Sequence, residues 1–404
     1  AWAVRSGQDI YAVPDPHGWH FNYLPIYAIA LVPLADPPPN VARAGMFPFG
    51  VSVAIWYIIN LVCLARAVNI LAAVLERAMA PRLGGIPPPY SRSWWSLRVI
   101  PVVIAVAPVG FTLGRGQSNL ILLLAISAMI AAVLERRMTA AGLWLAAAIC
   151  IKVIPVYLLI YPLWRRNLRM LAGCGVGLFI GLFMIPAVVL GPARALGYLA
   201  EWNRVVAHPA SAPGGDRSRD AELLDPNRND IQSIQAIVHR WSNFSETVSI
   251  PRGAFRSSRL QPYARVVHWA GGAILTVITL MLAGLYPRDA LSEELVIASL
   301  LVPMILLSLA SHLHYYALLI PLIMGLMAWA CGPQVYPGER WIVFFASLAI
   351  ALLLPLIPGL EMLGDLGLAA AASLSLWAAA LVVVSSAPRN DDKSASGAAL
   401  SLHN

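Results

Sequence analysis

The chain has 404 residues, of which 59% are hydrophobic and 12% are charged, and its formal net charge is +8. Apolar stretches of about 20 residues recur along it, so the composition predicts an all-α polytopic membrane protein. The positive charge comes almost wholly from arginines in loops, without a nucleic-acid-binding motif, and we expect no nucleic-acid partner. The four cysteines lie singly, which excludes the paired spacing of a zinc site or a disulfide framework.

The first residues are polar and aromatic, and the chain opens at Ala1 rather than at a methionine. We therefore expect a first membrane span to be missing, and residues 1–22 to lie outside the membrane. Residues 24–35 are apolar but too short to cross, which indicates a re-entrant or surface position. Further spans are predicted near residues 47–75, 98–112, 119–135, 168–190, 266–286, 293–310, 316–331, 341–357 and 366–385.

Arginine-rich loops are typical of the cytoplasmic side, and this rule orients the spans. It places residues 1–22, 114–119, 192–264 and 311–315 together on the outer face. The expected architecture is one transmembrane domain over residues 1–385, a bundle of about 10–12 transmembrane helices with a long extracytoplasmic loop at 192–264. Residues 386–404 are expected to form a disordered cytoplasmic tail.

Lys152 is one of only two lysines in the chain, and it lies inside an apolar segment. A cation at membrane depth is costly unless it faces an interior cavity and an anion, so it marks a candidate functional site. Residues 140–163 begin and end beside arginines of the cytoplasmic side, which excludes one full crossing. We expect a broken or re-entrant pair of half-helices that turns near Lys152 and Pro155, where irregular backbone lines a cavity.

Four polar groups of the outer face are candidates for chemistry, and each has a plainer interpretation. They are residues 9–23, residues 114–119, the long-loop motifs 229–233 and 239–241, and residues 311–316. The turn Gly114–Asn119 could only cap the next helix. His312 and His314 are two positions apart, so on a helix they face different ways, which argues against a shared metal. Tyr23, Trp19 and Trp241 could belong to an interfacial aromatic belt. Because the lysine, histidines, amides and arginines would converge on one side, the pattern favours a phosphate site.

Five motifs follow one another along the chain: Gly7-Gln8-Asp9-Ile10-Tyr11, Phe21-Asn22-Tyr23-Leu24-Pro25, Gly116-Gln117-Ser118-Asn119, the segment from Ala141 to Lys152 with Trp164-Arg165-Arg166 after it, and His312 to Tyr315. Their order resembles the C-type (GT-C) membrane glycosyltransferases, and in particular glycosyltransferase family 87, which contains polyprenol-phosphate-mannose-dependent α-1,2-mannosyltransferases, and it implies a GT-C-like bundle. One departure is that the family's lysine is commonly followed directly by proline, whereas Val153 and Ile154 intervene here.

The resemblance implies transfer of a hexose, mannose by preference, from a polyprenyl-phosphate donor to a glycolipid or glycan acceptor, with membrane lipid as surroundings. His314 and Lys152 are the expected catalytic residues, and the family's aspartate base is expected upstream of Ala1. No metal and no cofactor is expected. The expected substrate-binding residues are Gln117, Asn119, Arg115, Tyr23, Trp19, His312, Gln232 and Arg240.

Two other functional classes of membrane protein also fit the sequence at this point. A secondary transporter also has broken helices and buried charges, but it predicts pseudo-symmetry between halves, which the sequence lacks. A flippase or ligase of polyprenyl-linked glycans handles the same lipids and differs only in its chemistry. The expected location is a bacterial cytoplasmic membrane, with the site on the extracytoplasmic face. Glycolipid, polysaccharide and protein acceptors all remain open.

Overall fold

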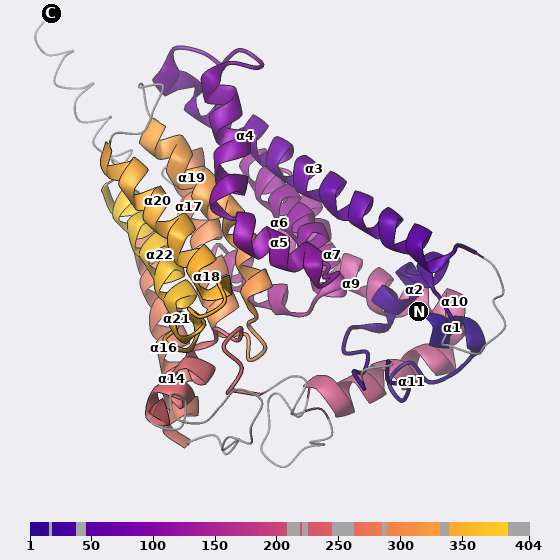
Figure 1. Cartoon of the computed structure of the whole chain (residues 1–404). Helices are drawn as coiled ribbons and strands as arrows, with labels where there is room; N and C mark the ends of the chain where they lie inside the picture. The colour runs from indigo at the N-terminus through magenta and orange to yellow at the C-terminus, as the bar shows by residue number, and fades with distance from the viewer. Residues whose placement is uncertain are drawn as a thin grey trace, which may run out of the picture.

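The computed structural model describes residues 1–15, 18–37, 46–207, 219, 225–244, 262–284, 289–331 and 339–386. Over these ranges the fold is all-α, as predicted, and the one isolated β-bridge joins Ile231 to His312 (Figure 1). The predicted tail beyond Ser386 lies outside the described residues. So do Ser245, the last residue of the Asn243-Phe244-Ser245 glycosylation sequon in the sequence, and the outer-loop arginines Arg252, Arg256 and Arg259.

Five helices of the described part are long and apolar enough to cross a membrane, or six if a bent pair forms one span. The predicted ten to twelve crossings therefore exceed what length and composition identify, because several predicted spans are divided into shorter helices. The five are α3 (Phe49–Leu83), α9 (Leu168–Phe179) continued through η3 (Ile180–Met184) into α10 (Ile185–Leu190), α16 (Pro262–Ala283), η5 (Leu313–Leu319) continued into α19 (Ile320–Cys331), and α22 (Leu368–Ser386).

Two of these helices expose apolar side chains. Val188 of α10 is 81% exposed, and Met281 and Val266 of α16 are 72% and 68% exposed. Water would oppose such contiguous apolar exposure, whereas lipid tails accept it. These surfaces support the prediction of a multi-pass membrane protein.

The predicted break at Lys152 is present. α7 (Met138–Ile151) ends there, Lys152 is extended, and η2 (Ile154–Leu159) and α8 (Ile160–Trp164) follow. α7 and α9 pack tightly, and residue numbers rise together along both: Gly142 lies against Met170, and Cys150 lies against Gly181. The two helices are therefore parallel, so the chain must return between them. η2 and α8 span about 20 Å, nearly the 21 Å or so of α7, which makes residues 138–164 a re-entrant element.

Gly142 permits the close approach of α7 to α9, and its replacement by alanine should destabilise the protein. The added methyl group would overlap the backbone oxygen of Met170 and the backbone nitrogen of Cys174, neither of which can move away cheaply. We expect a loss of ~3 kcal/mol, measured as a lower melting temperature of the purified protein. Gly175→Ala on α9 is the matched control, because its methyl group meets nothing within 4 Å. Equal melting temperatures for the two variants would contradict this packing.

The interior of the bundle consists of α6 (Asn119–Leu134), α17 (Ala290–Ser299), α18 (Leu301–Leu306) and α19, whose side chains are mostly buried. Around them lie α4 (Arg92–Ile104) and α5 (Val106–Gly114), bent by 61° at Ala105. α20 (Glu339–Leu353) and η6 (Leu354–Leu356) lie on the same side of the bundle as α4 and α5. α6 begins at the Gly116–Asn119 turn, so the core directly supports that turn.

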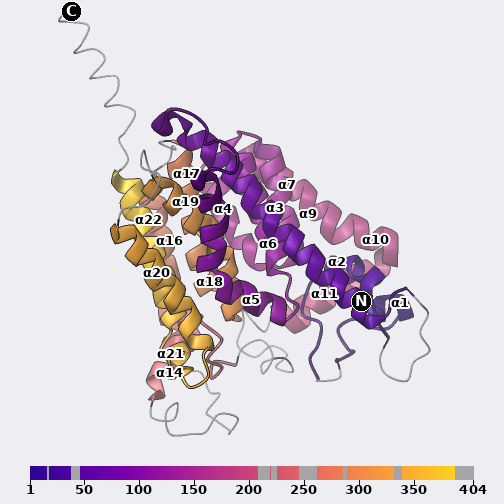
Figure 2. The same cartoon turned by 45° about the horizontal axis from the view of Figure 1, so that its top comes forward.

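The short elements gather at one end of the bundle and along one flank. α14 (Ile234–Ser242) and α21 (Met362–Asp365) lie at the lower end of the bundle in both views, whereas α1, α2 and α11 lie toward the right of both views (Figures 1 and 2). The Ile231–His312 bridge fastens the segment before α14 to the start of η5: Gln232 N donates to Ser311 O at 2.6 Å, and Leu313 N donates to Asp230 O at 2.8 Å. The elements on the flank are α1 (Trp2–Ser6), α2 (Pro25–Ala30), η1 (Val32–Leu34), α11 (Pro192–Trp202) and η4 (Asn203–Ala207).

Candidate functional site

Lys152 lies at the break between α7 and η2, and three distant segments meet its ammonium group. Its Nζ donates to Asn119 Oδ1 at 3.1 Å and lies 3.8 Å from the ring centroid of Tyr315. The ring of Tyr23 is 5.8 Å away, within the range of a cation–π interaction. Tyr23 in turn donates its hydroxyl to Gln117 Oε1 at 2.8 Å. Lys152 therefore lies among polar and aromatic groups, with no carboxylate paired to it among the ion pairs of the described residues.

Asp230 lies at the centre of a second group of side chains. Its Oδ2 is 2.9 Å from Arg115 Nη2 and 3.0 Å from Arg228 Nη2, and His312 Nδ1 is 3.2 Å away. Two guanidinium groups thus share one carboxylate, which leaves the group with net positive charge. Arg115 also stacks over Phe111, with its Cζ 4.4 Å from the ring centroid.

The titration of Asp230 and His312 follows from this arrangement. Burial opposes ionisation of Asp230, but the hydrogen bond to His312 and the charge of Arg228 outweigh it and hold the pKa of the carboxyl well below its usual range. Burial lowers the pKa of His312; Asp230 opposes this shift, whereas Arg228 and Arg115 reinforce it. Asp230 is therefore an ionised acceptor for His312 Nδ1–H, and its pKa is too low for an effective general base at neutral pH.

His314 connects the two groups. Its ring lies 5.2 Å from that of His312 and 4.9 Å from that of Tyr315, stacked in both cases. Its backbone oxygen accepts from Asn119 Nδ2 at 2.8 Å and from Thr112 Oγ1 at 3.2 Å. The Nδ1 atom of His314 is buried and has no hydrogen-bond partner among the described residues. A buried unpartnered imidazole nitrogen is costly, so it is available to a bound ligand.

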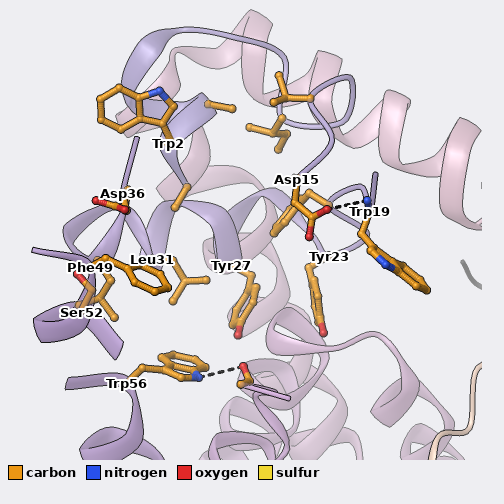
Figure 3. Close-up of a pocket in the computed structure, with 18 of the residues that line it drawn as sticks. Trp2, Asp15, Trp19, Tyr23, Tyr27, Leu31, Asp36, Phe49, Ser52 and Trp56 are labelled. Carbon is orange, nitrogen blue, oxygen red and sulfur yellow. Dashed lines mark hydrogen bonds between the residues drawn. The ribbon is translucent and has the colours of Figure 1, made fainter. Parts of the chain in front are cut away.

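Two cavities flank these residues. The smaller, of about 340 Å³, is lined by Arg115, Arg228, Asp230 and Gln232, among others. The larger, of about 1460 Å³, is lined mainly by aromatic and aliphatic side chains, with Tyr27 and Tyr23 side by side along one wall (Figure 3). The two adjoin at two points. Arg115 and Gln117 belong to one turn but line different cavities, and Arg228 Cζ lies 5.6 Å from the ring of Trp19 in the larger one.

Nine of the ten predicted site residues meet in this region: His314, Lys152, Gln117, Asn119, Arg115, Tyr23, Trp19, His312 and Gln232. Gln232 lines the smaller cavity and donates its side-chain amide to the backbone oxygens of Asn229 and Gly364. Arg240 is different, because it lines neither cavity and is 1% exposed. It donates to the backbone oxygens of Pro226, Arg228 and Asp365. Its contacts indicate that it positions the Arg228–Asp230 segment rather than touching substrate.

Three residues of the site were not selected from the sequence. Asp230 lies in a polar segment from which only Gln232 was chosen, and Arg228 and Tyr315 were not singled out. A charged residue in a polar outer loop has no sequence signal that separates it from a solvated one. The i, i+2 spacing of Arg228 and Asp230 lets the two side chains pair, but it did not enter the sequence prediction.

The arrangement suits an anion next to an uncharged ligand. Arginine forks and a lysine ammonium are the usual partners of phosphate oxygens, and here they lie in a partly buried site where their charges are weakly screened. The aromatic cavity beside them favours flat apolar faces with polar edges. Such a site would hold a phosphate ester at the boundary between the two cavities.

One of three comparisons with known proteins finds a match. A family model described as glycosyltransferase family 87 matches residues 21–311. The match covers the Tyr23 segment, the Gly116–Asn119 turn, Lys152 and Asp230, and it ends at Ser311, just before His312. No curated protein and no solved structure matches the chain.

Proposed function

Because the chain belongs to glycosyltransferase family 87, we propose that it transfers a hexose, mannose in the first instance, from a polyprenyl-phosphate sugar to a glycan or glycolipid at the outer face of a bacterial cytoplasmic membrane. The observation that carries the proposal is the convergence of Lys152, Arg115, Arg228 and two histidines from four separate segments. That convergence supplies several donors for one phosphate group.

In the proposed reaction a hydroxyl oxygen of the acceptor bonds to the anomeric carbon of the donor. The bond from that carbon to the phosphate oxygen breaks, and its electron pair leaves with the polyprenyl phosphate. The proton of the hydroxyl passes to a general base, for which the family resemblance suggests an aspartate ahead of Gly7. Asp230 is not that base, because His312 and Arg228 hold its pKa well below its usual range and so make it a weak proton acceptor.

Lys152, Arg115 and His314 would act on the leaving group. Negative charge grows on the phosphate oxygen as the bond breaks, so fixed cations and N–H donors stabilise the transition state more than the ground state. Tyr315 and Tyr23 restrict the position of the Lys152 ammonium group, so little reorganisation is needed during the reaction.

The proposal is tested by transfer of labelled sugar from polyprenyl-phosphate mannose to membrane glycolipids, with the full chain in liposomes. We expect a labelled product, and a loss of roughly 10²-fold in rate for His314→Ala. Release of polyprenyl phosphate in step with the product would identify transfer. Movement of intact donor across the bilayer without a new glycosidic bond would overturn the proposal and indicate a flippase.

A further inference from the structure

Gln232 has an unpaired acceptor atom at the smaller cavity. The residue is 1% exposed, and its side-chain nitrogen donates to Asn229 O and to Gly364 O, both at 2.7 Å, so both amide hydrogens are used. Turning the amide over would place Oε1 against two carbonyl oxygens, so the orientation of the group is fixed. Oε1 itself is buried and has no hydrogen-bond partner among the described residues. An unpaired buried acceptor is costly, which indicates that a ligand supplies the donor.

The ligand group that pairs with Gln232 has to carry a hydrogen. A phosphate oxygen is an acceptor, as Oε1 is, and the two would repel each other. A hydroxyl group donates to an amide oxygen without that conflict. Gln232, Arg115 and Arg228 line the same cavity, and the two arginines are suited to phosphate. The lining therefore fits one molecule that carries both a phosphate group and a hydroxyl group.

The size and the remaining surface of the smaller cavity fit one sugar ring. Its volume of about 340 Å³ lies near the lower limit for small-molecule sites. Phe111, Leu313, Pro355 and Leu356 provide an apolar wall for the C–H face of such a ring. A polyprenyl chain in this cavity would leave the two arginines and Gln232 Oε1 facing hydrocarbon, which is costly. The cavity thus suits the sugar phosphate end of a lipid-linked donor better than its lipid end.

We propose that the hexose of the donor occupies the smaller cavity, with its phosphate at Arg115 and Arg228, and that Gln232 Oε1 accepts a hydrogen bond from one hydroxyl group of this hexose. This inference rests on the proposed function and names the residue that recognises the donor sugar. Gln232 is a specificity-determining residue on this basis. A sugar without that hydroxyl leaves the buried oxygen unpaired, and this cost is the source of the discrimination.

The turnover arm of the test compares polyprenyl-phosphate mannose with its four deoxy analogues, each lacking one hydroxyl of the sugar, with the full chain in liposomes. We expect one analogue to lose roughly 10- to 100-fold in kcat/KM, the cost of an unpaired buried acceptor. In Gln232→Leu this analogue and the intact donor should differ by less than about threefold. The variant also frees the backbone oxygens of Asn229 and Gly364, but that structural effect lowers transfer from both donors alike and leaves their ratio unchanged.

Gln235→Leu is the matched control, because Gln235 lies on α14 three positions further along and lines neither cavity. Its donor ratios should equal those of the original protein. Equal efficiency for all five donors in the original protein would overturn the inference, and that measurement needs no variant to fold. A deoxy penalty of the same size in Gln232→Leu would also overturn it, because another residue would then recognise the hydroxyl.

A binding arm separates this inference from the proposed function. Mannose 1-phosphate and inorganic phosphate compete for tritiated mannose 1-phosphate, without any lipid donor present. We expect the original protein to bind mannose 1-phosphate about tenfold more tightly than phosphate, and Gln232→Leu to reduce this preference to about twofold. That result without transfer from any polyprenyl donor would support the sugar phosphate site and overturn the proposed function. Transfer from polyprenyl-phosphate mannose with equal binding of the two ligands would overturn the inference and leave the transferase standing.

Discussion

Replacement of Lys152 by methionine is expected to lower kcat for hexose transfer roughly 10²- to 10³-fold, the range seen when one transition-state donor is removed. Methionine keeps the length of the side chain and removes its charge. The Nζ atom now has one hydrogen bond to a side chain, Asn119 Oδ1, and two aromatic neighbours. The ammonium group therefore has N–H donors left for the phosphate oxygen that gains charge in the reaction.

A structural role for Lys152 predicts a different result. If the ammonium group served only the fold, its loss would lower stability and affect activity through unfolding. Removing a half-buried cation that no carboxylate of the described residues balances should instead leave stability equal or higher. Melting temperature and kcat are therefore measured on the same preparation of Lys152→Met. A stable variant with little activity supports the phosphate role, and a stable variant with normal kcat excludes it.

Arg169→Met is the matched control for that experiment. It removes the same charge from an exposed position at the start of α9, at the opposite end of the re-entrant element from Lys152. We expect its kcat to stay within about twofold of the original, since exposed charges beyond about 10 Å are largely screened. A comparable loss in both variants would indicate an effect of net charge on the protein as a whole.

The fold was predictable where the physics is local. Hydrophobic length identifies membrane helices, and the charges at both ends of residues 140–163 forbid a single crossing, so the break at Lys152 followed from the sequence. The number of crossings did not, because the division of apolar segments depends on tertiary packing. The bend at Ala105 between α4 and α5 has a local signal in Pro108, whose ring excludes a hydrogen bond to Ile104 O, but that signal does not say whether the two helices form one span or two.

The site was predictable as a set of motifs but not as a geometry. Each chosen residue is of a type that binds phosphate or sugar, and motif order suggested that the motifs meet. The role of Asp230 depends on the bridge between Ile231 and His312, a pairing over 81 positions that has no signature in either segment. The larger cavity likewise forms only when residues 1–37 fold against α3. Periodicity and residue spacing in the sequence do not predict long-range contacts of this kind.

Asp230→Asn should reduce kcat/KM for the donor roughly 10²-fold, equivalent to about 2.7 kcal/mol, and should lower stability as well. The carboxylate is the common anion of Arg115, Arg228 and His312. Without it two neighbouring guanidinium groups repel each other and lose their fixed positions around the phosphate. Breaking a buried ion pair costs about 3–5 kcal/mol, and we expect about 2 here because Arg115 is 38% exposed and partly screened.

The stability effect should depend on pH in a defined direction. The pKa of Asp230 in the folded state lies well below its usual range, whereas in the unfolded chain it is about 4. The ionised carboxylate therefore contributes its full stabilisation above pH of about 5, and this contribution decreases as pH falls below about 4. Melting temperatures of the original protein and of Asp230→Asn should consequently differ at pH 7 and converge on acidification. A difference that persists unchanged at low pH would contradict the ionised state of Asp230.

Asp225→Asn separates the cluster from a general charge effect in the same loop. Asp225 lies five positions upstream, and its Oδ1 accepts from Asn227 N at 3.0 Å, a bond that the amide oxygen of asparagine can replace. We expect kcat/KM for this variant within about twofold of the original. If Asp225→Asn and Asp230→Asn reduce donor efficiency equally, the loop's net charge governs donor binding. If only Asp230→Asn does, the carboxylate acts by holding Arg115 and Arg228 where the phosphate binds, since an ionised Asp230 is itself no partner for an anion.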